Sequence, residues 1–169
     1  LEGRIAILEH AEACAATSSG MGAIASTVLT ILNAGDHMIA DECLYGCTHG
    51  LFQDHITRFG IEVDFIDTSI PGNIKKHMKP NTKLVYFETP ANPTLKIIDI
   101  KRAVEEGHSQ KGVMVICDNT FCSPILCNPL KLGVDCVVHS GTKYINGHTD
   151  VVCGFVCGKK EFIEKVKSH

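Results

Sequence analysis

The chain has 169 residues, of which 44% are hydrophobic and 21% charged, and its formal net charge is −3. This length and composition predict one domain with a substantial hydrophobic core rather than a disordered chain. The charge argues against nucleic-acid binding, which needs a basic surface, and no apolar run reaches the roughly 18 residues of a membrane-spanning helix.

Short apolar runs alternate with segments of helical period along the chain. The expected strands are 13–17, 37–41, 61–66, 83–88, 113–118, 135–139 and 151–157. The expected helices are 21–33, 46–59, 99–109 and 159–168, and all six prolines are expected between elements. This alternation predicts the α/β class, as one domain with a mostly parallel sheet and helices on both faces.

Polar residues follow five of the expected strands, at the point where each strand ends. They lie in the stretches 17–22, 41–45, 88–92, 118–121 and 139–143. Ligands of such sheets gather at the carboxyl ends of the strands. The sequence therefore predicts a site for a small anionic ligand at that edge.

The first of these stretches, residues 17–22, joins a short strand to an apolar helix. Small residues at a helix start leave backbone amides free to bind a phosphate, although a serine N-cap with glycines for the turn is an alternative. The pattern Gly20-x-Gly22-x-x-Ala25 also fits a degenerate dinucleotide fingerprint, with Asp41 as the ribose-binding acid. A nicotinamide or flavin oxidoreductase domain is therefore a second hypothesis.

Two later strand ends carry candidate catalytic groups. Lys143, in Ser140-Gly141-Thr142-Lys143, follows an apolar strand and could form a Schiff base once partly neutral; a solvated surface lysine is the alternative. Asp118 ends another apolar strand and could pair with a cation, or could be a turn residue. The chain contains neither a P-loop nor a Gly-x-Ser-x-Gly motif.

The nine cysteines include no Cys-x-x-Cys pair, so their spacing predicts no metal site. Residues 1–10 include charged side chains, whereas a secretory signal would be apolar there. Together with the odd number of cysteines, this predicts reduced thiols in a cytoplasmic protein. Most lie inside apolar runs and are expected to pack as small hydrophobes. Cys47 is the exception.

Phosphate-binding glycines, a strand-end aspartate and a later Ser-x-Thr-Lys together resemble the fold-type-I pyridoxal-phosphate enzymes, and more narrowly the Cys/Met-metabolism family. The matching stretches span nearly the whole chain in the family's order: 1–9, 18–25, 41–48, 88–94, 118–124 and 139–147. The resemblance implies a large domain of that fold, the cofactor pyridoxal 5'-phosphate and an amino-acid substrate. It implies α,γ-elimination of L-methionine and related sulfur amino acids to a thiol, an α-keto acid and ammonia, with cystathionine γ-lyase, γ-synthase or β-lyase chemistry as alternatives.

Catalytic roles carry over from the family residue by residue. Lys143 is expected to bind the cofactor as a Schiff base and then move the substrate Cα proton, and Asp118 to pair with the pyridinium nitrogen. Tyr45 is expected to stack on the ring and to protonate the leaving thiol. Cys47 is expected to favour methionine, because cystathionine-type relatives usually carry glycine after Tyr-Gly; a buried spacer is the alternative.

The remaining carried-over residues bind the cofactor. The amides of Gly20 and Met21 and the hydroxyls of Ser140 and Thr142 are expected at the phosphate. Asn92 is expected to bind the phenolic oxygen of the ring. Thr120 is expected to contact the ring face opposite Tyr45.

The resemblance also implies an incomplete protein. Residues 1–169 match the cofactor-binding large domain, without the N-terminal arm and the C-terminal domain that supplies the substrate-carboxylate arginine. Family members are tetramers built of active dimers, so a homotetramer is expected. A noncatalytic fragment that keeps the fold is a third hypothesis.

Overall fold

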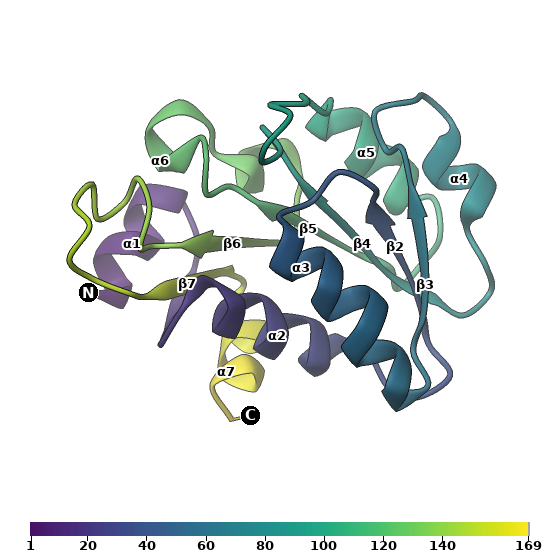
Figure 1. Ribbon diagram of the computed structural model, residues 1–169, viewed down its shortest axis with the longest axis horizontal. Coiled ribbons are helices and arrows are strands. Elements are labelled where there is room, and N and C mark those ends of the chain that lie inside the picture. The colour runs from purple at the N-terminus through teal and green to yellow at the C-terminus, as the bar shows by residue number, and fades with distance from the viewer. Residues whose placement is uncertain (169) are drawn as a thin grey trace.

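The structure is a computed structural model that describes residues 1–168. Seven strands form one sheet in the order β1-β7-β6-β5-β4-β2-β3 (Figure 1). The strands are β1 (Ala13–Thr17), β2 (His37–Asp41), β3 (Glu62–Ile66), β4 (Thr82–Glu88), β5 (Met114–Asp118), β6 (Cys136–Ser140) and β7 (Gly154–Gly158).

All neighbouring strands are parallel except around β7, which is antiparallel to both β1 and β6. An antiparallel neighbour needs no helical crossover, so the chain returns from β6 to β7 through a loop, and that loop carries Lys143. The prediction of a mostly parallel α/β sheet is confirmed.

Helices cover both faces of the sheet (Figure 1). One face is covered by α2 (Gly20–Ile31), by α7 (Lys160–Ser168) and by the continuous helical segment α3 (Gly46–Gly50), η1 (Leu51–His55) and η2 (Ile56–Phe59). The other face is covered by α1 (Glu2–Glu9), α4 (Asn73–His77) and α5 (Ile100–Gly107). Two short helices, α6 (Ser123–Leu126) and η3 (Pro129–Leu132), lie between β5 and β6 in the chain.

Strand β4 shows how the sequence builds this three-layer arrangement. Leu84 and Tyr86 belong to the apolar cluster under α2, whereas Val85 and Phe87 belong to the cluster under α5. All four side chains are fully buried. A strand covered on both faces needs apolar residues at successive positions, which is why residues 84–87 form a continuous apolar run.

The seven strands lie where they were expected, with ends that differ by up to three residues. The last strand begins at Gly154 instead of residue 151, because Val151 and Val152 are exposed in the preceding loop. Gly154 lies so close to α2 that a Cβ there would stand 2.2 Å from the carbonyl oxygen of Ser19. This close approach fixes the start of β7 beside the start of α2.

Four short helical segments were not expected from the sequence: α1, α4, α6 and η3. The expectation that every proline lies between elements was therefore wrong for Pro124 and Pro129, which occupy the first turns of α6 and η3. Proline is tolerated there because a first-turn N–H has no partner within the helix. Within residues 1–168, every helix is too short or too polar to cross a bilayer.

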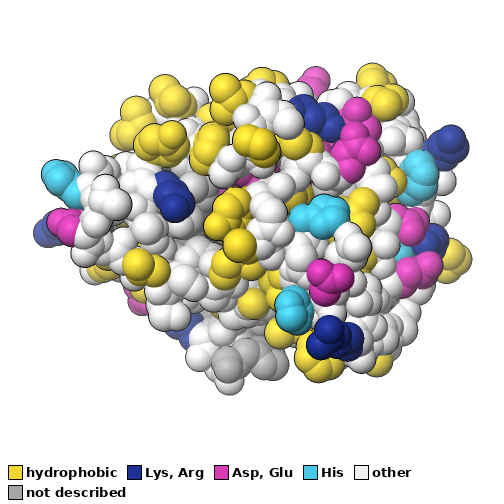
Figure 2. Space-filling model, viewed as in Figure 1, with side chains coloured by type: hydrophobic (Ala, Val, Ile, Leu, Met, Phe, Trp, Pro, Cys, Tyr) yellow, Lys and Arg dark blue, Asp and Glu magenta, His cyan; other side chains and the backbone are white. Residues whose placement is uncertain are grey.

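Hydrophobic side chains also gather on the surface, over the region of α6 in the view of Figure 2. Ile125 and Leu126 of this helix are 79% and 78% exposed. Tyr144 and Val152, in the loop between β6 and β7, are exposed as well. Apolar surface of this kind is typical of a face that contacts another protein chain.

Candidate active site

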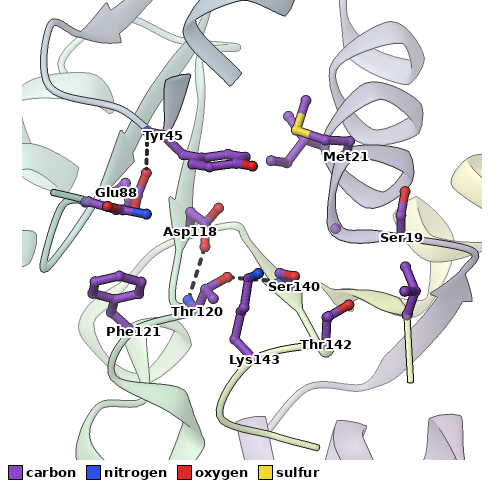
Figure 3. Close-up of a pocket in the computed structure, with 14 residues that line it drawn as sticks. Ser19, Met21, Tyr45, Glu88, Asp118, Thr120, Phe121, Ser140, Thr142 and Lys143 are labelled. Atoms are coloured by element: carbon purple, nitrogen blue, oxygen red, sulfur yellow. Dashed lines mark hydrogen bonds between the residues drawn. The ribbon is translucent and has the colours of Figure 1, made fainter. Parts of the chain in front are cut away.

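A cavity of about 340 Å³ lies at the carboxyl edge of the parallel strands. Its lining comes from the strand ends that the sequence singled out, together with the start of α2 (Figure 3). The lining residues are Ser19, Gly20, Met21, Ile24, Tyr45, Glu88, Asn92, Asp118, Thr120, Phe121, Ser140, Thr142, Lys143 and Val152. Every residue expected to bind the cofactor is among them.

The start of α2 forms one wall of the cavity. Ser19 is its N-cap, and its Oγ accepts a hydrogen bond from the N–H of Gly22 at 3.0 Å. Gly20 packs so closely on β6 that a Cβ there would stand 2.7 Å from the Cβ of Ser140. First-turn amides such as those of Gly20 and Met21 have no acceptor within the helix. The serine cap and a phosphate site are therefore compatible at this helix start.

Asp118 lies at the base of the cavity, at the end of β5, and is 6% exposed. Its Oδ1 accepts a hydrogen bond from the N–H of Thr120 at 2.9 Å, and its Oδ2 accepts one from the hydroxyl of Tyr86 at 3.3 Å. Burial raises the pKa of this carboxyl group. Within residues 1–168 no cationic side chain forms an ion pair with it, so a cation entering the cavity would find a carboxylate ready to pair.

Thr120 joins this acid to the next strand. Its Oγ1 accepts a hydrogen bond from the N–H of Ser140 at 2.8 Å. Lys143 follows in the turn after β6, held by a hydrogen bond from its own N–H to the carbonyl of Ser140 at 3.1 Å. The lysine side chain enters the cavity and points toward Thr120 and Ser140 (Figure 3). It is exposed through the open cavity, and no acid in the described part of the chain pairs with it.

Glu88 is the site residue whose contribution the sequence did not reveal. It is 3% exposed at the end of β4, and its Oε2 accepts a hydrogen bond from the N–H of Tyr45 at 2.8 Å. Its Oε1 accepts another from the N–H of Asn92 at 3.0 Å. Burial, with the nearby charge of Asp118, raises the pKa of Glu88 to about 7. The available signal was an acid that directly follows the apolar run of residues 84–87.

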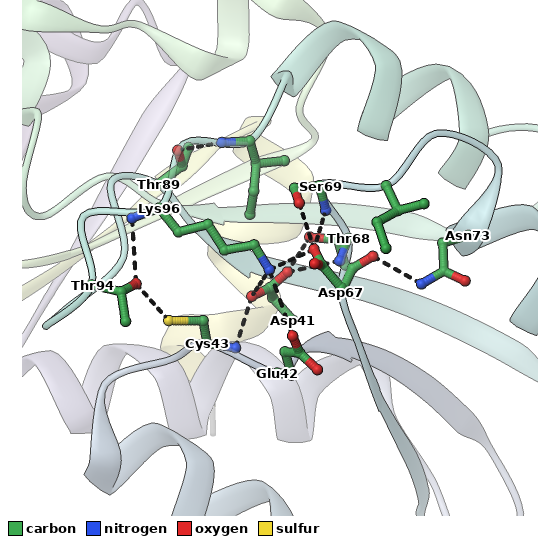
Figure 4. A network of polar contacts seen from close by, with 12 residues as sticks. Asp41, Glu42, Cys43, Asp67, Thr68, Ser69, Asn73, Thr89, Thr94 and Lys96 are labelled. Atoms are coloured by element: carbon green, nitrogen blue, oxygen red, sulfur yellow. Dashed lines mark hydrogen bonds and ion pairs between the residues drawn. The ribbon is translucent and has the colours of Figure 1, made fainter.

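Asp41 lies outside the cavity, in the network of Figure 4. It is fully buried, and its carboxylate accepts hydrogen bonds from the N–H of Cys43 at 2.8 Å and from both the N–H and the hydroxyl of Thr68. Lys96, 2.5 Å from Asp67, completes the network at 3.5 Å from Asp41. The expectation of a ribose-binding acid at Asp41 was therefore wrong, because the fold itself occupies this carboxylate.

Cys47 does not line the cavity, although it was expected to act in catalysis. It is exposed in the first turn of α3, so the alternative of a buried spacer was wrong. Its thiol interacts with the side chain of Tyr45 and thereby raises the pKa of the Tyr45 hydroxyl. The structure thus places Cys47 beside a cavity residue rather than in the cavity wall.

All nine cysteines are free, and the described residues contain no cluster of histidine, cysteine or acidic side chains that could hold a metal ion. The polar groups around the cavity instead form an anion-binding helix start, a buried acid and an amine. Such a set suits a ligand with a phosphate at one end and a cationic ring atom at the other.

Known proteins are similar to this chain in sequence and in fold. A family model described as Cys/Met metabolism PLP-dependent enzyme matches residues 1–169. The chain is 54% identical over 167 residues to an L-methionine gamma-lyase of Fusobacterium nucleatum subsp. polymorphum, covering 99% of this chain and 42% of the relative. It is 46% identical to the cystathionine beta-lyase MetC of Bacillus subtilis, covering 98% and 42%.

A solved structure agrees with these relatives. The crystal structure of metB from Corynebacterium glutamicum superposes with a TM-score of 0.95 at 42% identity, covering 98% of this chain and 43% of that one. The chain thus spans less than half the length of the relatives it matches.

Proposed function

The chain belongs to the Cys/Met metabolism PLP-dependent enzymes, and from that premise we propose that the whole protein eliminates the γ-substituent of L-methionine and related sulfur amino acids. With the uptake of one water, methionine would give a thiol, an α-keto acid and ammonia. One observation carries the proposal: a single cavity brings together Lys143, Asp118 and the first-turn amides of α2. Four relatives named L-methionine gamma-lyase are 49% to 54% identical to this chain.

The residues around the cavity fit pyridoxal 5'-phosphate. The buried carboxylate of Asp118 has no ion-pair partner within residues 1–168, and a pyridinium N–H would supply one. At the opposite wall, Gly20 leaves room for no Cβ against Ser140, which keeps free amides beside a hydroxyl. When bound, the cofactor supplies a ring that withdraws electrons from the substrate Cα.

We assign each binding contact to a residue of the cavity. The N–H groups of Gly20 and Met21 would hold the phosphate together with the hydroxyls of Ser140 and Thr142. Asp118 would pair with the ring nitrogen, and Asn92 would donate to the phenolic oxygen. Tyr45 and Thr120 would lie against the two faces of the ring. Lys143 would bind the aldehyde covalently.

Two side chains would move protons during the reaction. The amine of Lys143, once substrate has displaced it, would accept the proton from Cα. The hydroxyl of Tyr45 would donate a proton to the departing sulfur. A raised pKa keeps this hydroxyl protonated at neutral pH, as a proton donor requires.

Cys47 would set the preference for methionine over cystathionine. Its interaction with Tyr45, which raises the pKa of the tyrosine hydroxyl, supports this role, because it puts a thiol beside the proposed proton donor. Cystathionine cleavage is the second candidate function, because the cystathionine beta-lyase relative is 46% identical to this chain, against 43% and 41% for two of the relatives named L-methionine gamma-lyase.

We further propose that residues 1–169 are one part of a larger cytoplasmic enzyme. The chain's share of its relatives' length supports an N-terminal arm and a C-terminal domain beyond it, the latter with the arginine for the substrate carboxylate. The exposed apolar side chains of α6 support assembly into a homotetramer. Nine free thiols support a reducing compartment.

The test uses the full-length protein with L-methionine, and with L-cystathionine as the comparison substrate. The expected result is a visible absorbance band that borohydride abolishes, together with release of thiol and α-keto acid from methionine. A protein that lacks this band and binds nicotinamide cofactor instead would refute the proposal. Cystathionine cleavage without methionine cleavage would favour the second function.

A further inference from the structure

A buried polar cluster lies directly behind the cavity. Its centre is Glu9, the last residue of α1, which is fully buried. The Glu9 Oε1 atom is 2.5 Å from Nε2 of His139 and accepts a hydrogen bond from Nδ2 of Asn119 at 2.9 Å. Both partners are buried too, and they lie 130 and 110 residues further along the chain.

The partners of Glu9 are the immediate neighbours of two cavity residues. His139 precedes Ser140 on β6, and Asn119 follows Asp118 at the end of β5. The N–H of Asn119 also donates to the carbonyl of Val138 at 3.1 Å, which joins the two strand ends. Glu9 therefore holds from behind the same two strand ends that present an acid and a hydroxyl to the cavity.

The cluster lowers the stability of the fold compared with an apolar contact between helix and sheet. Glu9 Oε2, His139 Nδ1 and Asn119 Oδ1 are buried and have no hydrogen-bond partner within the described residues. Each such atom lowers the stability of the fold, and apolar side chains of similar volume would pack α1 on the sheet without this cost. A polar cluster kept at this position is better explained by the site than by stability.

The cluster also acts on the cavity through its charge. Burial raises the pKa of Asp118, and the charge of His139 acts against that rise. This opposing effect favours the ionised form of Asp118, the form that can pair with a pyridinium nitrogen.

We propose that Glu9 and His139 are positioning residues of the cofactor site, which set the places of Ser140 and Asp118 without touching the ligand. This inference rests on the proposed binding of pyridoxal 5'-phosphate. Through Glu9, helix α1 would influence cofactor affinity although it contributes no residue to the cavity lining.

A purely structural role makes a different prediction, and the chain offers a matched control. Glu106 of α5 is also buried, at 5% exposure. Its carboxylate likewise joins two elements, by accepting hydrogen bonds from the N–H groups of Gly72 and Ile74 at 2.8 and 3.2 Å. Neither Glu106 nor its partners line the cavity.

The experiment compares Glu9→Gln, Glu9→Met and Glu106→Met in the full-length protein. Each apoprotein is titrated with pyridoxal 5'-phosphate to obtain its Kd, and its melting temperature and the absorbance spectrum of the loaded form are recorded. We expect Glu9→Met to weaken cofactor binding about tenfold or more, the loss of one strong hydrogen bond, and to shift the absorbance band. Glu9→Gln should show a smaller loss, because its amide oxygen can still accept hydrogen bonds.

Glu106→Met should lower the melting temperature while leaving the Kd and the spectrum as in the wild type. Glu9 variants with wild-type Kd and spectrum would overturn the inference, whatever their melting temperatures. If Glu9→Met does not fold, Glu9→Gln and His139→Gln decide by the same comparison with Glu106→Gln. A wild-type protein that binds no pyridoxal 5'-phosphate would refute the proposed function itself, a result distinct from equal binding by wild type and variants.

Discussion

The Oε2 atom of Glu88 accepts a 2.8 Å hydrogen bond from the backbone N–H of Tyr45, across 43 residues of sequence. Its second oxygen accepts the N–H of Asn92. One buried side chain at the end of β4 thereby fixes two loops, and these loops carry the tyrosine and the asparagine proposed to contact the cofactor ring. The positions of both depend on an acid that we do not assign to the chemistry.

Replacing Glu88 by glutamine should weaken the site. The amide offers one oxygen acceptor, so only one of the two backbone N–H groups keeps its partner while the other faces an NH₂ donor. We expect kcat/KM for methionine to fall about tenfold, the effect of losing one hydrogen bond to a buried group. Steady-state kinetics test this, and an unchanged kcat/KM would show that the loops hold their positions without Glu88.

The stability of the apoprotein should depend on pH through the same residue. The pKa of Glu88 is about 7 in the folded protein against a model-peptide value of 4.5. Between these values the folded state binds more protons than the unfolded state, so stability falls as pH rises through this window. The loss is roughly 3 kcal/mol across the whole window.

Denaturant midpoints of wild-type and Glu88→Gln apoprotein, measured at several pH values, isolate this contribution. The difference between the two proteins should change in favour of the variant as pH rises from 4.5 to about 7. Parallel pH profiles would show that Glu88 titrates normally.

Lys143→Ala should abolish covalent attachment of the cofactor and leave the fold intact. The lysine side chain is exposed, and no acid within residues 1–168 pairs with it, so its removal breaks no ion pair. Mass spectrometry after borohydride reduction should find the cofactor fixed to the wild type alone. A cofactor fixed to the variant would move this role to another lysine.

Asp118→Asn should separate stability from turnover. Because burial raises the pKa of Asp118, its charge is costly in the empty site, and the neutral variant should be at least as stable as the wild-type apoprotein. Turnover should fall about a hundredfold, since an amide cannot hold the ring-nitrogen proton by charge. Melting temperature and kcat test the two parts, and near-normal turnover would show that Asp118 is only a turn residue.

Cys47→Gly should change specificity. Removing the thiol beside Tyr45 should lower kcat/KM for methionine about tenfold, while kcat/KM for cystathionine and cysteine falls less. Cys43→Ala is the matched control, since the thiol of this half-buried cysteine contacts the Thr94 hydroxyl at 2.8 Å and not Tyr45. Equal losses on all substrates would remove Cys47 from substrate choice.

Local patterns predicted the layers of the fold and the place of the site. Strand β2 has the expected ends because its run, buried at every position, ends at a polar turn. The strand-end residues meet in one cavity because parallel strands present their carboxyl ends at one edge. These features depend on periodicity, which a single sequence displays.

What the sequence did not reveal depends on contacts between distant segments. Helix α1 forms where Ile5 and Ala6 become buried in the core, a tertiary effect that helix propensity does not report. The antiparallel direction of β7 leaves no trace in its apolar pattern. Likewise, the partners of Glu9 are specified by the folded chain and not by spacing.

The position of β1 has a consequence for how the protein is made. This strand is synthesised first, yet its neighbour in the described sheet is β7, the last of the seven. A nascent chain that has emerged from the ribosome only as far as β6 can assemble the parallel strands, but β1 then has no strand on which to pair. Since the start of α2 packs closely against Gly154, we expect the wall proposed to bind the phosphate to form only after that glycine has left the exit tunnel. We therefore expect the chain to bind its cofactor late in synthesis, after β7 has emerged.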